Sequence, residues 1–181
     1  ELCEATSILA NKGIYIKPTL IKKITTFDDE VIYEKKQKKY KIADESDVYI
    51  LNEAMTSLFD DKITYNIRPT GVSINALLTK KYSAKSGSTK TDNWMIGYNP
   101  SVCCVVWTGF DNNSEIIKSS DLKSAKYIWA DTVEAYMKDK DDVWYDKPND
   151  VIGVELNPMT GFYPSFSEYY KTIYLKTDNL P

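Results

Sequence analysis

The sequence predicts an α+β fold in which covering helices pack on an antiparallel sheet and a small β appendage follows at the C-terminal end. Three short extended segments succeed one another between Tyr82 and Phe110, and an amphipathic helical segment follows them. Strand-like pieces return within 143–181. The 181 residues, of which 43% are hydrophobic and 27% charged, are typical of about one globular domain.

The chain begins with a helical pattern. Apolar residues recur on one helical face before a C-cap signature at 11–13, Asn-Lys-Gly, and they are Leu2, Ala5, Ile8 and Leu9. No capping residue precedes this helix, and the chain begins on Glu1 rather than on methionine. We therefore expect a piece of a longer protein.

A hairpin and a second helix are predicted next. Residues 14–26 alternate with β-branched side chains, turn at 27–30 and resume at 31–33, whereas 35–41 read as a solvated basic stretch. Asp44, with Asp47 three residues on, can cap a helix. The apolar residues at helical spacing predict its core face, namely Val48, Leu51, Met55 and Leu58.

The central part of the chain predicts an antiparallel meander. A turn at 68–71 precedes one short helix around Ile74, Leu77 and Leu78. The extended segments are 82–89, 94–98 and 102–110, separated by Asp-Asn and Asn-Pro. The third is apolar enough to be a central strand.

The clearest helix follows, with a cap at Ser119, Ser120 or Asp121, and we expect it to lie across the sheet. Its predicted buried stripe consists of Leu122, Ala125, Trp129, Thr132 and Tyr136. A charged linker at 138–142 then leads to the appendage. We place the domain boundary there, with 1–138 as one unit and 139–181 as linker and appendage.

The composition excludes several classes of function. The chain has no histidine, so a Ser-His-Asp triad, a zincin helix and a His-ligated metal site are excluded within it. A net charge of −3, with Arg68 as the one arginine, predicts no nucleic-acid partner. We also expect no metal or other cofactor, and no segment approaches the length of a membrane span.

The most informative segment is Lys85-Ser86-Gly87-Ser88-Thr89. On a strand Ser86 and Ser88 share one face, where two hydroxyls can bind a carboxylate. Gly87 has no Cβ and so permits close approach of another backbone. Lys85 adds a positive field that favours an anionic group or a developing oxyanion. Taken alone these few letters are typical of a surface turn, and the strands and helix around them favour a site.

Four stretches of the chain resemble the penicillin-binding transpeptidases. Ala84–Pro100, AKSGSTKTDNWMIGYNP, resembles their third active-site motif, the K-[ST]-G-[ST] strand. Glu1–Ile24 is similar to the family segment in which a helix ends at N-x-G and a strand with K-P follows. Val102–Asp111, VCCVVWTGFD, resembles the strand that ends in V-W-x-G-x-D. Tyr174–Pro181, YLKTDNLP, resembles the tail of bifunctional, class A members.

The resemblance implies the C-terminal half of a transpeptidase domain, with the fold of penicillin-binding transpeptidases and serine β-lactamases left incomplete. It implies that Lys85 contributes charge and orients the serine network, that Ser86 and Ser88 bind the substrate carboxylate, and that the Ser88 N–H is an oxyanion-hole donor. Gly87 would permit close packing, and Thr89 would continue the strand that pairs with substrate.

The implied reaction is the cross-linking of peptidoglycan stem peptides by serine acyl transfer, with a lysine as the base and β-lactams as inhibitors. The implied partners are the stem peptide, β-lactam antibiotics and the N-terminal half of the same domain. The parent protein would work at the extracytoplasmic face of the membrane of a Gram-positive bacterium, held by an N-terminal anchor outside this chain. Two alternatives stay open: a non-catalytic binding module on this scaffold, and a related carboxypeptidase or β-lactamase.

The sequence departs from the family pattern in its nucleophile. Ser120-Asp121-Leu122-Lys123 fits S-x-x-K formally, but it follows the K-S-G strand, whereas the family serine precedes it. Ser73-Ile74-Asn75 fits S-x-N, yet it lies about ten residues before Lys85 rather than far upstream, and a coincidence in a turn explains it better. We therefore expect the nucleophile outside this chain and no acylation by the chain alone.

The cysteines favour a structural interpretation. Cys103 and Cys104 point to opposite faces of one strand, which disfavours a vicinal disulfide and predicts buried thiols. Nothing in the sequence assigns a partner to Cys3.

Overall fold

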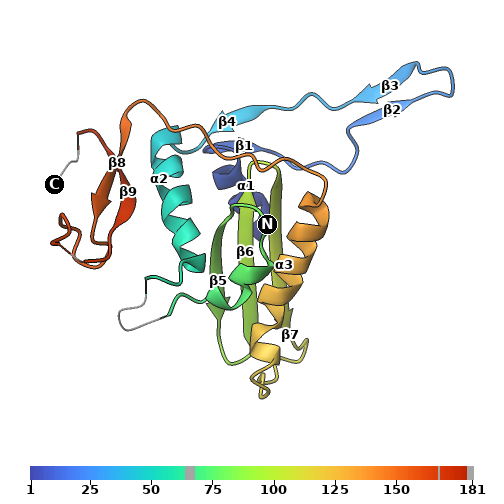
Figure 1. The fold of residues 1–181 in the computed structure, drawn as a ribbon. Coiled ribbons are helices and arrows are strands. Elements are labelled where there is room, and N and C mark those ends of the chain that lie inside the picture. Colours follow the sequence, from blue (N-terminus) through green and yellow to red (C-terminus); the bar gives the residue numbers. More distant parts are fainter. Residues whose placement is uncertain (64–67, 167, 179–181) are drawn as a thin grey trace.

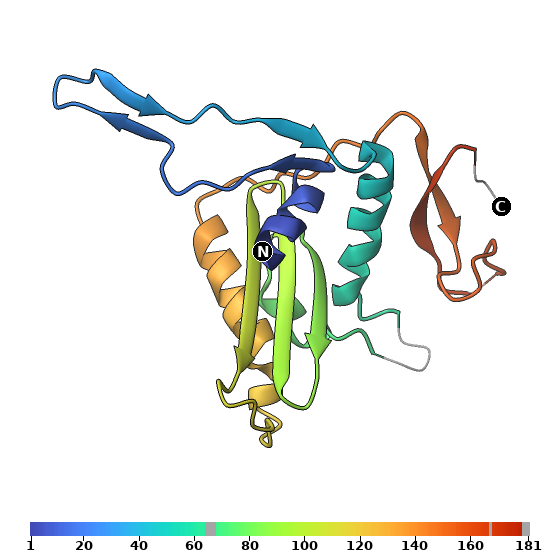
Figure 2. The ribbon, with the colours of Figure 1, turned by 180° about the vertical axis from the view of Figure 1, so that it is seen from behind.

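In the computed structural model, which describes residues 1–63, 68–166 and 168–178, a three-stranded antiparallel sheet lies between helices (Figure 1). Its strands are β5 (Ser83–Ser88), β6 (Asp92–Asn99) and β7 (Val102–Gly109), in the order β5-β6-β7. Helix α3 (Ser124–Met137) packs on one face and α1 (Leu2–Ala10) on the other, as the reverse view in Figure 2 shows. The predicted α+β class is confirmed.

The meander is confirmed, but the prediction of a central third strand was wrong. Among the described residues, β6 is the central strand and β7 is an edge strand. Every residue of β7 is at least partly exposed, whereas Met95 and Tyr98 of β6 are completely buried. The apolar sequence of this segment suggested a central position, but the position of a strand in a sheet depends on which strands pair with it.

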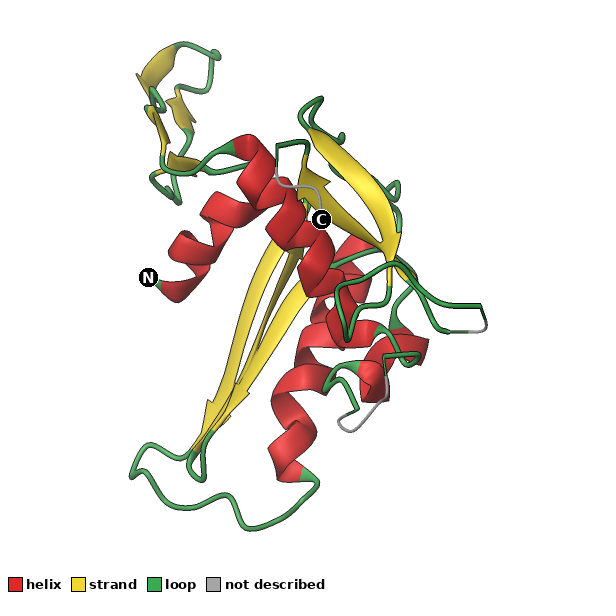
Figure 3. Cartoon of the chain, turned by 90° about the vertical axis from the view of Figure 1, so that its left-hand side faces the viewer, coloured by secondary structure: helices red, strands yellow, loops and turns green. Residues whose placement is uncertain are grey.

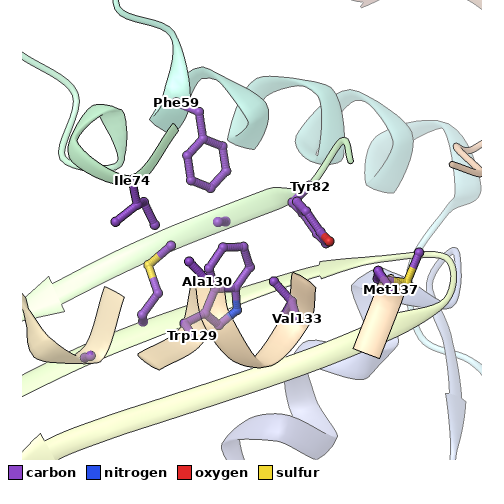
Figure 4. Close-up of a cluster of buried hydrophobic side chains, with 10 residues drawn as sticks. Phe59, Ile74, Tyr82, Trp129, Ala130, Val133 and Met137 are labelled. Atoms are coloured by element: carbon purple, nitrogen blue, oxygen red, sulfur yellow. The ribbon is translucent and has the colours of Figure 1, made fainter. Parts of the chain in front are cut away.

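The main core lies between the sheet and α3, around the indole of Trp129 (Figure 4). Its other members come from the sheet, from the residue before β5, from α3 and from the 3₁₀ helices η1 (Thr56–Phe59) and η2 (Val72–Leu77). They are Phe59, Ile74, Tyr82, Ala84, Met95, Ala125, Ala130, Val133 and Met137. The predicted short helix near Ile74 is thus confirmed as η2. Seen from the side in Figure 3, the sheet lies between α1 and α3.

Two predictions about α3 were wrong. Leu122, Thr132 and Tyr136 of the predicted stripe are exposed, and Leu122 precedes the helix. The buried row runs through Ala125, Trp129, Val133 and Met137 instead. A helix has 3.6 residues per turn, so residues spaced by three and residues spaced by four lie on different faces after two turns. Which of these faces is buried depends on what the helix packs against.

The predicted caps of α3 also do not form. A 3₁₀ turn, η3 (Asp121–Lys123), precedes the helix, and Ser124 Oγ donates to the Asp121 carbonyl at 2.6 Å. Ser120 donates to the Asp121 carboxylate at 2.9 Å instead of capping a helix.

Helix α1 ends as predicted, because Gly13 adopts a φ of 84° and its N–H donates to the Ile8 carbonyl at 2.8 Å. Helix α2 (Glu45–Met55) begins at the predicted cap, where the Asp44 carboxylate accepts the Ser46 N–H at 3.1 Å.

The predicted core face of α2 was partly wrong. Val48 is buried, but Leu51 is 42% exposed and Tyr49 and Asn52 are buried in its place. The polar Asn52 can be buried because its carboxamide oxygen accepts the Tyr98 hydroxyl at 2.8 Å.

Residues 14–42 form an arm that extends away from the sheet (Figure 1). At its base β1 (Ile14–Ile16) pairs with β4 (Lys39–Lys41), and farther out β2 (Lys23–Thr25) pairs with β3 (Val31–Glu34). The predicted hairpin is confirmed at β2–β3, but 14–26 is not one strand, because the chain leaves the strand conformation between β1 and β2. The last three residues of the basic stretch at 35–41 form β4.

The C-terminal segment forms the hairpin of β8 (Val151–Leu156) and β9 (Lys171–Lys176), which packs against α2. A second apolar cluster joins Tyr49 to Tyr145 and Val151. The Ser46 hydroxyl donates to Asp150 at 2.5 Å. No helix in the described parts of the chain is long and apolar enough to cross a membrane.

Candidate active site

Strand β5 is an edge strand, and its free edge is where a second backbone could pair. Among the described residues its one strand partner is β6, with Ser88 opposite Asn93. The Thr89 N–H donates to the Asp92 carbonyl at 2.9 Å, toward β6. Because main-chain groups alternate in direction along an antiparallel strand, the N–H and C=O of Ser86 and of Ser88 point toward the free edge.

The side chains of Ser86 and Ser88 share a face with Ala84, which is buried in the same core cluster as Trp129. Ser86 is partly buried, and its Oγ lies 2.6 Å from the Oγ1 of Thr70. Ser88 is exposed. The structure therefore brings a short row of hydroxyls together beside the free edge of β5.

Lys85 lies on the opposite face of β5 and is exposed. Its ammonium group donates to the Ser86 carbonyl at 2.7 Å. That carbonyl points toward the free edge, so the positive charge of Lys85 lies beside the same edge as the serine main-chain groups.

Lys126 and Thr70 also belong to this site, although the sequence did not predict them as site residues. Lys126 on α3 donates to the Thr70 carbonyl at 2.7 Å and so fixes the loop that holds the Thr70 hydroxyl near Ser86. Burial lowers the pKa of the Lys126 ammonium, and nearby Lys123 lowers it further. No local pattern links residues 56 positions apart, and the 68–71 turn was the one available signal.

The surroundings of Gly87 differ from the expectation. A Cβ built there would meet only the Cβ of Trp94, at 3.8 Å, which is an ordinary contact. Close approach of another backbone is therefore not made within the described residues, and this face of β5 is open at Gly87.

The turn after β5 is held by the Asp92 carboxylate. Oδ2 accepts the hydroxyls of Thr91 and Thr89 at 2.8 and 3.0 Å, and Oδ1 accepts the Trp107 indole N–H from β7 at 2.9 Å. These bonds, that of Trp107 above all, lower the pKa of Asp92. Thr89 is thus fixed at the end of β5, with its hydroxyl turned to the hairpin.

The formal matches to S-x-x-K at Ser120 and to S-x-N at Ser73 do not have the surroundings of catalytic residues. Ser120 hydrogen-bonds its neighbour Asp121 at the surface. In η2 the intervening Ile74 is completely buried in the core, whereas Ser73 and Asn75 are exposed. Neither serine shows a lysine among its hydrogen-bond partners within the described residues.

The chain matches known proteins both in sequence and in fold. No family model matches the chain. The sequence is 37% identical to penicillin-binding protein 2D of Bacillus subtilis over 90% of this chain, and 26% identical to penicillin-binding protein 1A of Mycobacterium tuberculosis over 84% of it. The chain spans 23% and 20% of these two relatives, less than a quarter of their length.

Among solved structures, penicillin-binding protein 1A of Haemophilus influenzae superposes with a TM-score of 0.82 at 14% identity, covering 97% of this chain and 31% of that one. The fold is therefore that of part of a penicillin-binding transpeptidase domain. The sequence relatives extend this from fold to family. The chain belongs to the penicillin-binding proteins, of the class A type represented by the 1A proteins, and it comprises a partial transpeptidase domain.

The resemblance noted at Tyr174–Pro181 lies partly outside the described residues, since 179–181 are not among them.

Proposed function

We propose that this chain is the part of a peptidoglycan D,D-transpeptidase that supplies the substrate-binding K-S-G-S strand. The observation that supports this most directly is the free edge of β5, toward which the main-chain groups of Ser86 and Ser88 point. An extended stem peptide or a β-lactam could add to this edge as a further strand.

Each residue of the motif has a role in the proposal. Ser86 and Ser88 bind the substrate's terminal carboxylate through their hydroxyls, and the Ser88 N–H donates to the oxyanion. Lys85 supplies positive charge beside the free edge and helps to orient the serine network. Gly87 leaves room for the incoming backbone, and Thr89 ends the strand at a position fixed by Asp92.

The proposed reaction is acyl transfer by a serine outside this chain. The serine attacks the penultimate D-alanine carbonyl of a stem peptide and the C–N bond to the terminal D-alanine breaks, which releases D-alanine. An amine of a neighbouring strand then attacks the ester and frees the serine. A lysine removes the serine proton and the departing amine takes it up, so the step needs no histidine. We place the parent protein at the extracytoplasmic face of a Gram-positive cell membrane, attached by an N-terminal anchor.

The isolated chain tests where the nucleophile is. We expect no covalent labelling of residues 1–181 by a fluorescent penicillin, followed on a denaturing gel. We expect labelling of the full-length protein. Labelling of the isolated chain would place a nucleophile within it and would overturn this part of the proposal.

The role of the strand is tested in the full-length protein. Replacing Lys85 or Ser88 by alanine should slow penicillin acylation about a hundredfold, because each removes charge or hydrogen bonds that the transition state uses. Lys90→Ala, an exposed lysine just beyond the strand, is the matched control and should acylate at the wild-type rate.

Other outcomes identify the alternatives. A full-length protein that is not labelled at all is a binding module on this scaffold. An acyl-enzyme that forms and then hydrolyses within seconds indicates a β-lactamase, and release of D-alanine without cross-linking indicates a carboxypeptidase.

A further inference from the structure

The structure gives Cys3 a neighbour that the sequence does not. Cys3 lies on α1 and Cys103 on β7, and their Sγ atoms are 3.9 Å apart although 100 positions separate them. Each sulfur also lies 3.8 Å from the carbonyl oxygen of the other residue. These reciprocal contacts show that the two backbones approach closely, and that the thiols face each other.

We propose that Cys3 and Cys103 form a reversible disulfide that links α1 to β7. A disulfide bond is about 2.05 Å long, so closure needs the two sulfurs to approach by rotation of side chains that are already in contact. Cys3 is exposed, and its thiol is therefore accessible to an external disulfide.

The pairing is specific to Cys103 because of the strand geometry. Cys104 pairs across the sheet with Gly97, which lies directly beneath the Trp129 indole, so Cys104 faces α3 and packs against the main core. Neighbouring residues of a strand point to opposite faces, and Cys103 therefore faces α1. The linkage joins α1 to the side of the sheet opposite the main core.

The oxidant is a low-molecular-weight disulfide, and the exchange proceeds in two steps. The Cys3 thiolate attacks one sulfur of the oxidant, forms a mixed disulfide and releases one thiolate, which takes up a proton. The Cys103 thiol loses its proton to solvent and attacks the Cys3 sulfur, which expels the second thiolate. The protein loses two hydrogens and the oxidant is reduced to two thiols.

Burial above all, and then the neighbouring thiols, raise the pKa of Cys103 to about 12, so little of it is thiolate near neutral pH and its attack on the mixed disulfide is slow. The closure rate should therefore rise about tenfold per pH unit from pH 7 to pH 9, because the thiolate fraction rises in that proportion.

The test is oxidation of the chain with oxidised glutathione, followed by intact mass and peptide mapping. We expect a mass lower by about 2 Da, loss of two of the three free thiols, and a single Cys3–Cys103 cross-linked peptide. The thermal midpoint should rise by several degrees, because the link closes a long loop, and dithiothreitol should reverse the shift.

Single-cysteine variants identify which two cysteines form the disulfide. Cys104→Ser should still lose about 2 Da, whereas Cys3→Ser and Cys103→Ser should not. Three titratable thiols after oxidation, a cross-link that includes Cys104, a stable glutathione adduct on Cys3, or a disulfide-linked dimer would each overturn the proposal. Cys103→Ala provides the same test if the serine variant does not fold. This inference does not depend on the proposed transpeptidase function.

Discussion

At the scale of single residues, the Asp92 carboxylate joins the turn after β5 to β7 through the Trp107 indole. The hydrogen bonds it accepts hold its pKa below the ordinary value of 3.8. A group whose pKa is lowered on folding stabilises the folded state at pH values above its unfolded pKa. That stabilisation is lost as the pH falls through the folded pKa.

We therefore expect Asp92→Asn to lower the urea midpoint at pH 6, and the difference from the wild type to shrink below about pH 4. Urea unfolding at pH 6, 5, 4 and 3 measures it. Glu115→Gln, an exposed carboxylate in a long 3.6 Å ion pair with Lys90, is the control and should match the wild type throughout. A constant difference between wild type and Asp92→Asn across this range would contradict the explanation.

Two glycines of the sheet differ in the space around them. A Cβ at Gly97 would lie 2.3 Å from Cζ2 of the completely buried Trp129, whereas at Gly87 it would meet only the Cβ of Trp94 at 3.8 Å. We expect Gly97→Ala to destabilise the chain by about 1–3 kcal/mol or more, and Gly87→Ala to have little effect on stability. Chemical denaturation compares the two, and equal effects would be inconsistent with the packing described here.

At the scale of secondary structure elements, the start of α2 depends on one side chain. The Asp44 carboxylate accepts the Ser46 N–H and also lies 3.1 Å from the Lys41 ammonium. Asp44→Ala should lower the thermal midpoint by a few degrees because an orphan N–H loses its acceptor. Asp44→Asn keeps an oxygen acceptor and should retain most of the midpoint, since the exposed ion pair contributes little.

The elements also show where sequence reasoning succeeded. The alternation before and after 27–30 predicted the β2–β3 hairpin, and the Asn-Lys-Gly at 11–13 predicted the end of α1. These signals are local, because they concern contacts between residues a few positions apart. The prediction of the buried face of α3 was partly wrong, because that face is set by contacts with the sheet and with η2. The helical period does not contain information about those contacts.

At the scale of the whole molecule, the C-terminal hairpin shares a cluster with the rest of the chain. Tyr145 and Val151 bury Tyr49, and the Tyr145 hydroxyl donates to the Ala10 carbonyl at 3.0 Å. Removal of 139–181 exposes Tyr49 of α2.

We expect the truncated chain 1–138 to unfold at a lower temperature and with lower cooperativity than the full chain, because burial of apolar surface stabilises α2. Circular dichroism during heating measures this. Phe166→Ser, at a completely exposed position of the same segment, is the control and should unfold like the wild type. If 1–138 keeps the full midpoint, residues 139–181 do not stabilise the rest of the chain, and this explanation is wrong.

The sequence by itself determined the succession of the three strands along the chain, the β2–β3 hairpin, the helix caps at Gly13 and Asp44, and the motif from Lys85 to Thr89 whose resemblance pointed to the family. Each depends on local periodicity, on turn chemistry or on a contiguous run of residues. Only the tertiary structure decided that β7 is an edge strand, that Thr70 meets Ser86, and that Cys3 meets Cys103. These contacts join residues from 16 to 100 positions apart, and they exist only because the covering elements pack on particular faces of the sheet.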